Sequence, residues 1–171
     1  AYIDFSRNFG KEVAIAAGFD NIQGDAIVII DADLQDPPEL IPELHAKWRE
    51  GYDVAYAARA SRRSDSLAKR TSASWFYRLY NHLTDIRIPN DAGDFRLLDR
   101  RVVEALRRLP ERNRFMKGLY AWAGFRQIGV PYSRQPREAG ITKWGYWKLW
   151  NFALDGITSF SSLPLRVWTY V

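Results

Sequence analysis

A short, strongly apolar run at residues 26–30 (AIVII) leads directly into an acidic stretch at residues 31–39 (DADLQDPPE). A β-branched run of this length, bounded by turn and acidic residues, is typical of a buried strand. Side chains two residues apart on a strand point to the same side, so Asp31 and Asp33 should present their carboxylates together at its C-terminal end. Open α/β sheets bind ligands at that end. The sequence therefore predicts an α/β fold with a ligand site after this strand.

The two carboxylates of Asp31 and Asp33 offer hard oxygen ligands, which suit Mg²⁺ or Mn²⁺. Mg²⁺ usually takes one or two carboxylates and completes its shell with water and substrate phosphates. We therefore predict a divalent cation that bridges a diphosphate at this position. Asp36 and Glu39 are interpreted differently, because Asp as N-cap followed by proline and a glutamate in the first turn is the pattern of a helix start.

Apolar periodicity and turn residues divide the rest of the chain into alternating strands and helices. Strands are expected at residues 26–30, 53–57, 95–98 and 127–132, and helices at residues 11–22, 37–50, 66–83, 101–109 and 115–124. This alternation indicates an α/β sheet with crossover connections.

Composition narrows the class of protein without deciding it. The chain has 171 residues, 47% hydrophobic and 26% charged, which is typical of about one globular domain and argues against disorder. It has no cysteine and a net charge of +5, so disulfides are excluded and anionic partners are favoured. His45 and His82 lack metal-ligand spacing, and the sequence contains no Walker-type loop, dinucleotide fingerprint or nucleophile elbow.

Four segments in order carry a resemblance to a known family. They are residues 6–12 (SRNFGKE), 31–39 (DADLQDPPE), 90–97 (NDAGDFRL) and 137–143 (REAGITK). Together they resemble family 2 glycosyltransferases of the GT-A fold, and more narrowly the polyprenyl-phosphate glycosyltransferases. The resemblance implies a GT-A sheet with flanking helices. It also implies an inverting, divalent-metal-dependent transfer of a sugar from a nucleotide sugar, UDP-glucose favoured, to a polyprenyl phosphate such as undecaprenyl phosphate.

The same resemblance assigns roles to the acidic motifs. Gln35 becomes a third oxygen donor to the cation beside Asp31 and Asp33. Asp94 becomes the catalytic base or the group that orients the acceptor, and Gly93 is expected to permit a close backbone approach beside it. An acceptor phosphate is already charged at neutral pH, so positioning and charge compensation should matter more than a strong base.

Basic residues are the expected partners of the phosphates, because arginine binds them in a bidentate manner. By resemblance, Arg59 at the end of the second strand contacts phosphate. Arg70 and Ser74, four residues apart on one helix face, match an acceptor-side pair. Arg137 and Lys143 lie in a segment that the family uses as a mobile loop over the donor diphosphate.

The chain divides into two regions by composition. Residues 1–140 are expected to be a partial GT-A catalytic domain that lacks its N-terminal strands. Residues 141–171 carry four of the seven tryptophans and helical apolar spacing with nearby lysines, which is typical of an amphipathic helix at a membrane interface. A core helix that closes the domain is the alternative. No apolar stretch is long enough to span a membrane.

The resemblance extends these expectations to the whole protein. We expect an internal fragment of a longer enzyme, inactive alone, that is held at the cytoplasmic face of the plasma membrane by missing transmembrane helices. Those helices could also mediate a homo-oligomer. The expected partners are the nucleotide sugar, the polyprenyl phosphate and the membrane surface, without nucleic acid.

Other functions remain open at this point. A processive polysaccharide synthase of the same superfamily would carry a Gln-x-x-Arg-Trp motif, and residues 135–138 (QPRE) do not fit it. A nucleic-acid-binding module is suggested only by net charge, and the acidic strand end would oppose phosphate binding without a cation. A non-catalytic, membrane-docked scaffold would keep the fold without the chemistry.

Overall fold

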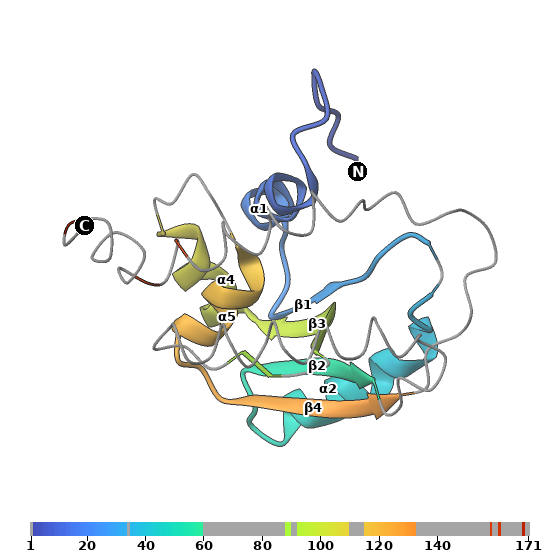
Figure 1. The fold of residues 1–171 in the computed structure, drawn as a ribbon. Helices are drawn as coiled ribbons and strands as arrows, with labels where there is room; N and C mark the ends of the chain where they lie inside the picture. Colours follow the sequence, from blue (N-terminus) through green and yellow to red (C-terminus); the bar gives the residue numbers. More distant parts are fainter. Residues whose placement is uncertain are drawn as a thin grey trace, which may run out of the picture.

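A computed structural model describes residues 2–33, 35–59, 88–89, 92–109 and 115–132, together with the single positions 158, 161 and 169. Its strands are β1 (Ala26–Ile29), β2 (Val54–Arg59), β3 (Ala92–Asp99) and β4 (Gln127–Tyr132) (Figure 1). Its helices are α1 (Lys11–Asn21), the 3₁₀ helix η1 (Pro38–Leu40), α2 (Ile41–Arg49), α4 (Arg100–Arg107) and α5 (Met116–Trp122). The mixed sheet with flanking helices confirms the predicted α/β class and agrees with the GT-A fold.

The described strands form one sheet in the order β1-β3-β2-β4. Strand β3 runs antiparallel to both of its neighbours, while β2 and β4 run parallel. The C-terminal ends of β1, β2 and β4 therefore lie at the same edge of the sheet as the start of β3. This edge, which we call the site edge, is where the candidate functional residues gather.

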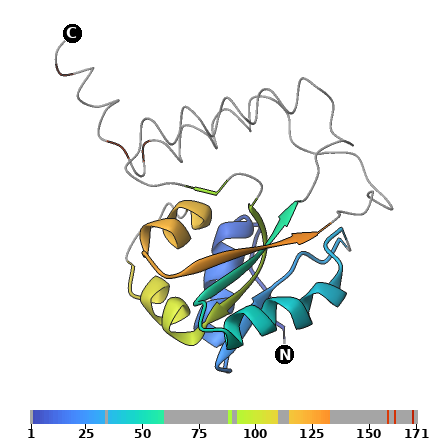
Figure 2. The ribbon, with the colours of Figure 1, turned by 90° about the horizontal axis from the view of Figure 1, so that it is seen from below.

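Helices cover both faces of the sheet, so the fold has three layers (Figure 2). Helices α1, α4 and α5 bury one face in a core that includes Leu98 and Val102, while η1 and α2 bury the other in a core that includes Leu44 and Leu97. Neighbouring residues on β3 enter opposite cores because side chains alternate across a strand. This alternation explains why Leu97 and Leu98 are both buried although they are adjacent in the chain.

Most of the predicted elements match the structure. The strand expected at residues 127–132 has the same bounds in β4, and the helix expected at residues 11–22 ends one residue earlier in α1. Strand β3 is longer than the expected 95–98 and includes Asp94. The expectation of a buried first strand holds for Ile27, whereas the other residues of β1 are half-buried and β3 is its single described neighbour.

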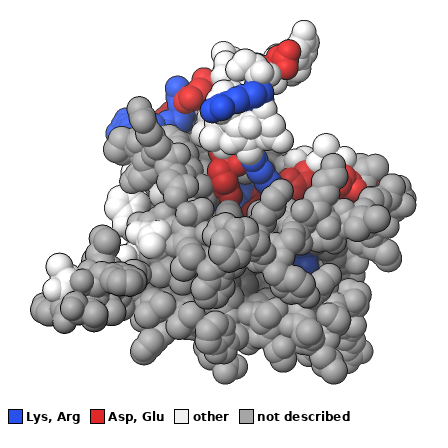
Figure 3. All heavy atoms as spheres, turned by 45° about the horizontal axis from the view of Figure 1, so that its top comes forward, with Lys and Arg blue, Asp and Glu red and all other residues white. Residues whose placement is uncertain are grey.

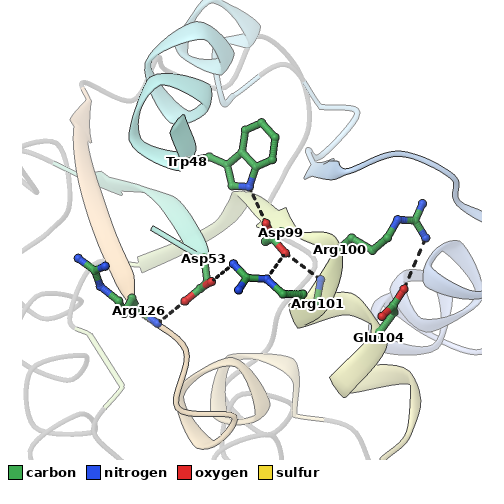
Figure 4. A network of polar contacts seen from close by, with 7 residues as sticks. All are labelled: Trp48, Asp53, Asp99, Arg100, Arg101, Glu104 and Arg126. Atoms are coloured by element: carbon green, nitrogen blue, oxygen red, sulfur yellow. Dashed lines mark hydrogen bonds and ion pairs between the residues drawn. The ribbon is translucent and has the colours of Figure 1, made fainter. Parts of the chain in front are cut away.

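A polar network holds the opposite edge of the sheet (Figure 4). Asp99 caps α4 by accepting a hydrogen bond from the Arg101 backbone N–H, and it also accepts one of 2.8 Å from Trp48 Nε1. Asp53 accepts hydrogen bonds from the Arg101 side chain and from the Arg126 backbone N–H. These contacts tie α2, α4 and the starts of β2 and β4 together, so this edge has a structural role.

Two predicted segments lie outside the described residues. They are the helix expected at residues 66–83 and, apart from positions 158, 161 and 169, the amphipathic region at residues 141–171. Among the residues that are described, no helix has the length and apolarity needed to cross a membrane.

Candidate functional site

The register of the sheet brings the two predicted acidic centres together. Ile29 of β1 pairs with Arg96 of β3 in the antiparallel ladder. Continuing that register by two residues puts Asp31 opposite Asp94. The carboxylates that the sequence assigned separately to the cation and to the acceptor therefore belong to one site at the site edge.

Lys11, at the first position of α1, joins these two carboxylates. Its Nζ lies 2.7 Å from Asp31 Oδ1 and 2.8 Å from Asp31 Oδ2, and it donates a hydrogen bond of 2.7 Å to Asp94 Oδ2. All three side chains keep access to solvent, with exposed fractions of 41%, 37% and 30% for Lys11, Asp31 and Asp94. Figure 3 shows acidic and basic side chains in contact on this side of the molecule.

The segment of residues 6–12 folds so that α1 starts at the site. Gly10 has a φ of +90°, a conformation that glycine adopts without steric cost, and its backbone N–H donates to Asn8 Oδ1. Helix α1 begins at the next residue and places both Lys11 and Glu12 at its first turn. This segment is one of the four that carry the family resemblance, but the sequence predicted no role for either charged residue.

Asp94 lies in an irregular part of β3 and not in a regular ladder. Tyr56 pairs with Arg96 and Ala58 with Ala92, so a single residue of β2 faces three residues of β3, Asp94 among them. Such bulges re-aim side chains and are common beside active sites. An added Cβ at Gly93 would lie 3.6 Å from the Ala57 carbonyl oxygen, an ordinary contact, so packing within the described residues does not itself require glycine here.

Basic groups surround Asp94. Burial by itself would raise the pKa of this carboxyl, but Lys117, Lys11 and Arg96 together hold the pKa below its usual value. Lys117 Nζ lies 3.8 Å from Asp94 Oδ1, on the oxygen that Lys11 does not bind. In the same way, Asp94 and Asp31 raise the pKa of Lys11 in spite of its partial burial. The site therefore holds an ionised carboxylate and a charged ammonium at neutral pH.

Glu12 adds a third carboxyl group near Asp94. Its Oε2 accepts a hydrogen bond of 3.3 Å from the Met116 backbone N–H, which connects the first turn of α1 to the start of α5. Burial and the neighbouring Asp94 charge raise the pKa of Glu12. The pKa of Glu12 is thus raised, whereas the pKa of Asp94 is lowered.

A buried arginine, Arg96, binds the backbone of the bulge. Arg96 is 2% exposed, its Nη2 donates a hydrogen bond of 2.6 Å to the Gly93 carbonyl, and its guanidinium lies 4.0 Å from the centre of the Tyr120 ring. Arg96 Nε and Tyr120 Oη have no hydrogen-bond partner among the described residues. Burying a charge in this way costs free energy. Because Arg96 donates to the carbonyl of Gly93, next to Asp94, we infer that it positions Asp94.

The loop that follows β1 is anchored inside the protein. Because β1 ends at Ile29, strand alternation does not govern Asp31 and Asp33 as predicted. Asp33 Oδ1 accepts a hydrogen bond of 3.3 Å from the Gln35 backbone N–H, and Gln35 itself is 6% exposed.

Asp36 has a different partner from the one predicted. Pro37 is the N-cap of η1, so the prediction that Asp36 caps this helix is wrong. Its buried carboxylate instead accepts a short hydrogen bond from Tyr132 Oη at the end of β4. Burial raises the pKa of Asp36, and burial together with Asp36 raises the pKa of Tyr132. This contact fixes the end of the 31–36 loop to the site edge.

Of the predicted phosphate-binding residues, Arg59 is described. It ends β2, as expected from the sequence. Its positive charge partly opposes the rise in the pKa values of Asp36 and Tyr132. Arg59 is thus brought to the same edge as Asp31 and Asp94. Arg70, Ser74, Arg137 and Lys143 lie outside the described residues.

Asp31 and Asp33 carry hard oxygen atoms, the type of donor that a divalent cation such as Mg²⁺ prefers. In the part of the chain that the structure describes, no group of three or more His, Cys, Asp or Glu residues could hold a metal ion. Mg²⁺ does not need such a group, because one or two carboxylates with water and substrate phosphates complete its shell. Asp31 and Asp33, at the open end of β1, supply that number.

Comparison with known proteins identifies the family. The model of glycosyl transferase family 2 matches residues 1–107, well over half of the chain. An uncharacterized glycosyltransferase of Synechocystis sp. is 61% identical over 169 residues, which are 99% of this chain and 53% of that protein.

Two further relatives carry a more specific name. A bactoprenol glucosyl transferase of Shigella phage SfV and a prophage bactoprenol glucosyl transferase homolog of Escherichia coli are each 53% identical over 99% of this chain and 55% of their own length. The chain thus spans about half the length of the curated relatives it matches. Its sequence and fold together show that the chain belongs to glycosyl transferase family 2.

Proposed function

We propose that the protein containing this chain transfers glucose from UDP-glucose to a polyprenyl phosphate such as undecaprenyl phosphate, with inversion at the anomeric carbon. The observation that carries this proposal is the meeting of Asp31 and Asp94 on one lysine at the open edge of the sheet. The names of the relatives, bactoprenol glucosyl transferase, support the choice of sugar and acceptor.

We assign the donor side of the reaction to Asp31 and Asp33. With a divalent cation bound, these carboxylates would hold the diphosphate of the nucleotide sugar, and the cation would neutralise the charge that develops on the leaving group. Gln35 is a third donor in this proposal through its resemblance to the family, and its burial means that its side chain would need to turn toward the site.

Asp94 acts on the acceptor side. A phosphate monoester already carries about −1.5 to −2 charges at pH 7, so it needs little deprotonation before it attacks. Asp94 therefore orients the acceptor phosphate and takes any remaining proton, while arginines compensate the phosphate charge. Arg59 serves at this edge, and Arg70, Ser74, Arg137 and Lys143 are proposed to complete the phosphate contacts.

The lipid acceptor places the reaction at a membrane surface. We propose that the protein works at the cytoplasmic face of the plasma membrane and that residues 141–171 lie in the interface. Supporting this, the region has four tryptophans and apolar residues at helical spacing, with Lys143 and Lys148 nearby.

The proposal is tested with the complete protein in membranes. Labelled UDP-glucose and a panel of other nucleotide sugars are supplied with undecaprenyl phosphate, with and without EDTA, for the wild type and Asp33→Asn. EDTA-sensitive label on the lipid from UDP-glucose, lost in Asp33→Asn, is the expected result. Label in a polymer would instead indicate a processive synthase, and no product from a folded protein would indicate a scaffold.

A further inference from the structure

Lys11 occupies the position where the two halves of the site meet. Its ammonium lies 2.7 Å from one carboxylate oxygen of Asp31 and 2.8 Å from the other, so a cation that binds Asp31 meets a positive charge already on this carboxylate. The same ammonium binds one oxygen of Asp94. A single side chain thus neutralises the donor-side and acceptor-side carboxylates at once.

We propose that Lys11 is a positioning residue that holds the place of the divalent cation on Asp31 and yields it when the cation binds. Lys11 then remains on Asp94, where it keeps the acceptor-side carboxylate in place. This inference rests on the proposed function, because it assumes that Asp31 is a ligand of the cation.

The geometry allows this exchange. The Lys11 side chain is 41% exposed and Asp31 is 37% exposed, so the pair stays in contact with solvent. Ion pairs with such exposure are weak, because water screens the attraction and the long side chain loses freedom. A cation of charge +2 therefore competes with the ammonium for Asp31, while Asp94 gives the ammonium a second anchor 2.7 Å away.

A second lysine in the described part of the site, Lys117, helps to separate the role of Lys11 from simple charge compensation of Asp94. Lys117 lies 3.8 Å from the other oxygen of Asp94 and is not paired with Asp31 by any described contact. Lys117 can thus compensate Asp94 alone, whereas Lys11 couples Asp94 to the cation site. The consequence is that loss of Lys11 alters the affinity for the metal, an effect that a purely structural lysine would not have.

The test measures Mn²⁺ binding to the complete protein without any substrate, by the loss of the free-ion electron paramagnetic resonance signal. The variants are Lys11→Met, Lys11→Arg and the double variant Lys11→Met with Asp31→Asn. Lys47→Met is the matched control, because the Lys47 side chain on α2 is similarly exposed, at 38%. It pairs with Glu50, the residue that follows this helix. Thermal unfolding verifies that each variant is folded.

Lys11→Met should bind Mn²⁺ about three- to fivefold more tightly than the wild type, the gain expected from removing one exposed competing ion pair. Lys11→Arg and Lys47→Met should match the wild type, and Asp31→Asn should abolish the gain. Unchanged or weaker binding in Lys11→Met, with Mn²⁺ still held by the wild type through Asp31, overturns the place-holder role alone. Binding that does not depend on Asp31 in any variant overturns the proposed metal site, and the inference with it.

Discussion

Asp31, two residues after β1, and Asp94 of β3 share one ammonium group at distances of 2.7 Å each. The β1–β3 pairing ends at Ile29 and Arg96, which brings both acidic segments to the same edge of the sheet, where Lys11 joins the two carboxylates. In the proposed reaction they act on different substrates.

Removing Lys117 should change the pH dependence of transfer. Lys117 is one of the basic groups that lower the pKa of Asp94, so Lys117→Met raises that pKa. Activity that needs the Asp94 carboxylate is lost as the pH falls through this pKa. The acidic limb of the kcat/KM profile should therefore move to higher pH. Lys47→Met is the control, and an unmoved acidic limb in Lys117→Met would show that Asp94 does not titrate in the reaction.

Tyr132→Phe should loosen the loop that carries the proposed cation ligands. The change removes a hydroxyl that donates to the buried carboxylate of Asp36, which costs about 1–3 kcal/mol in the free energy of unfolding. A lower Tm in a thermal unfolding experiment, together with weaker Mn²⁺ binding, is expected. Tyr2→Phe, at a side chain that is 92% exposed, should leave both unchanged. Normal Mn²⁺ binding in a destabilised Tyr132→Phe protein would mean that this anchor does not position the loop.

Arg96→Lys should lower transfer although the positive charge is kept. Lysine lacks the planar group that stacks on Tyr120 while donating to the Gly93 carbonyl, so the bulge that aims Asp94 loses its support. We expect kcat to fall about tenfold or more, the cost of misplacing a reacting group by a fraction of an ångström to an ångström. Arg49→Lys, at an exposed position of α2, is the control. Wild-type kcat in Arg96→Lys would contradict the positional role.

Asp99→Ala should destabilise the protein without affecting the site. Asp99 caps α4 and accepts from Trp48, so its loss costs about 1–3 kcal/mol. Burial alone would raise the pKa of Asp99, but hydrogen bonds from Trp48 and Arg101 lower it. The carboxylate therefore stabilises the wild type at neutral pH and stops doing so as the pH falls through its lowered pKa. The Tm difference between wild type and Asp99→Ala should shrink in acid, while Mn²⁺ affinity at pH 7 stays the same.

Glu50→Ala, an exposed change on the same side of the fold, is the control for Asp99→Ala. A Tm difference that does not depend on pH would show that the Asp99 charge is not what stabilises this edge. A change in Mn²⁺ affinity would show that the two edges of the sheet are coupled.

Local sequence patterns predicted most elements but not their pairing. Local sequence patterns located α1 and β4 almost to the residue. The insertion of β3 between β1 and β2 depends on contacts between distant segments, which no local pattern contains. For the same reason, the sequence overestimated the burial of the first strand.

The candidate site divides in the same way. Asp31, Asp33, Asp94 and Arg59 were identified from motifs and strand ends, and the structure gathers them at one edge. The partners of these groups were missed: Lys11 bridges segments far apart in the chain, and Tyr132 takes the carboxylate that the local pattern assigned to a helix cap. The position of Lys11, directly after a glycine at a predicted helix start, was the local signal that could have pointed to it.

The most direct test of the account is a comparison of Asp31→Asn and Asp94→Asn in the complete protein, in which Mn²⁺ binding and glucosyl transfer to undecaprenyl phosphate are measured on the same samples. Asp31→Asn should lose both Mn²⁺ binding and transfer. Asp94→Asn should keep Mn²⁺ bound through Asp31, within the few-fold change that the loss of the second anchor of Lys11 causes. It should lose transfer by about a hundredfold or more, as expected for a group that acts on the acceptor. Transfer at the wild-type rate in Asp94→Asn, or undiminished Mn²⁺ binding in Asp31→Asn, would contradict the division of roles between the two carboxylates.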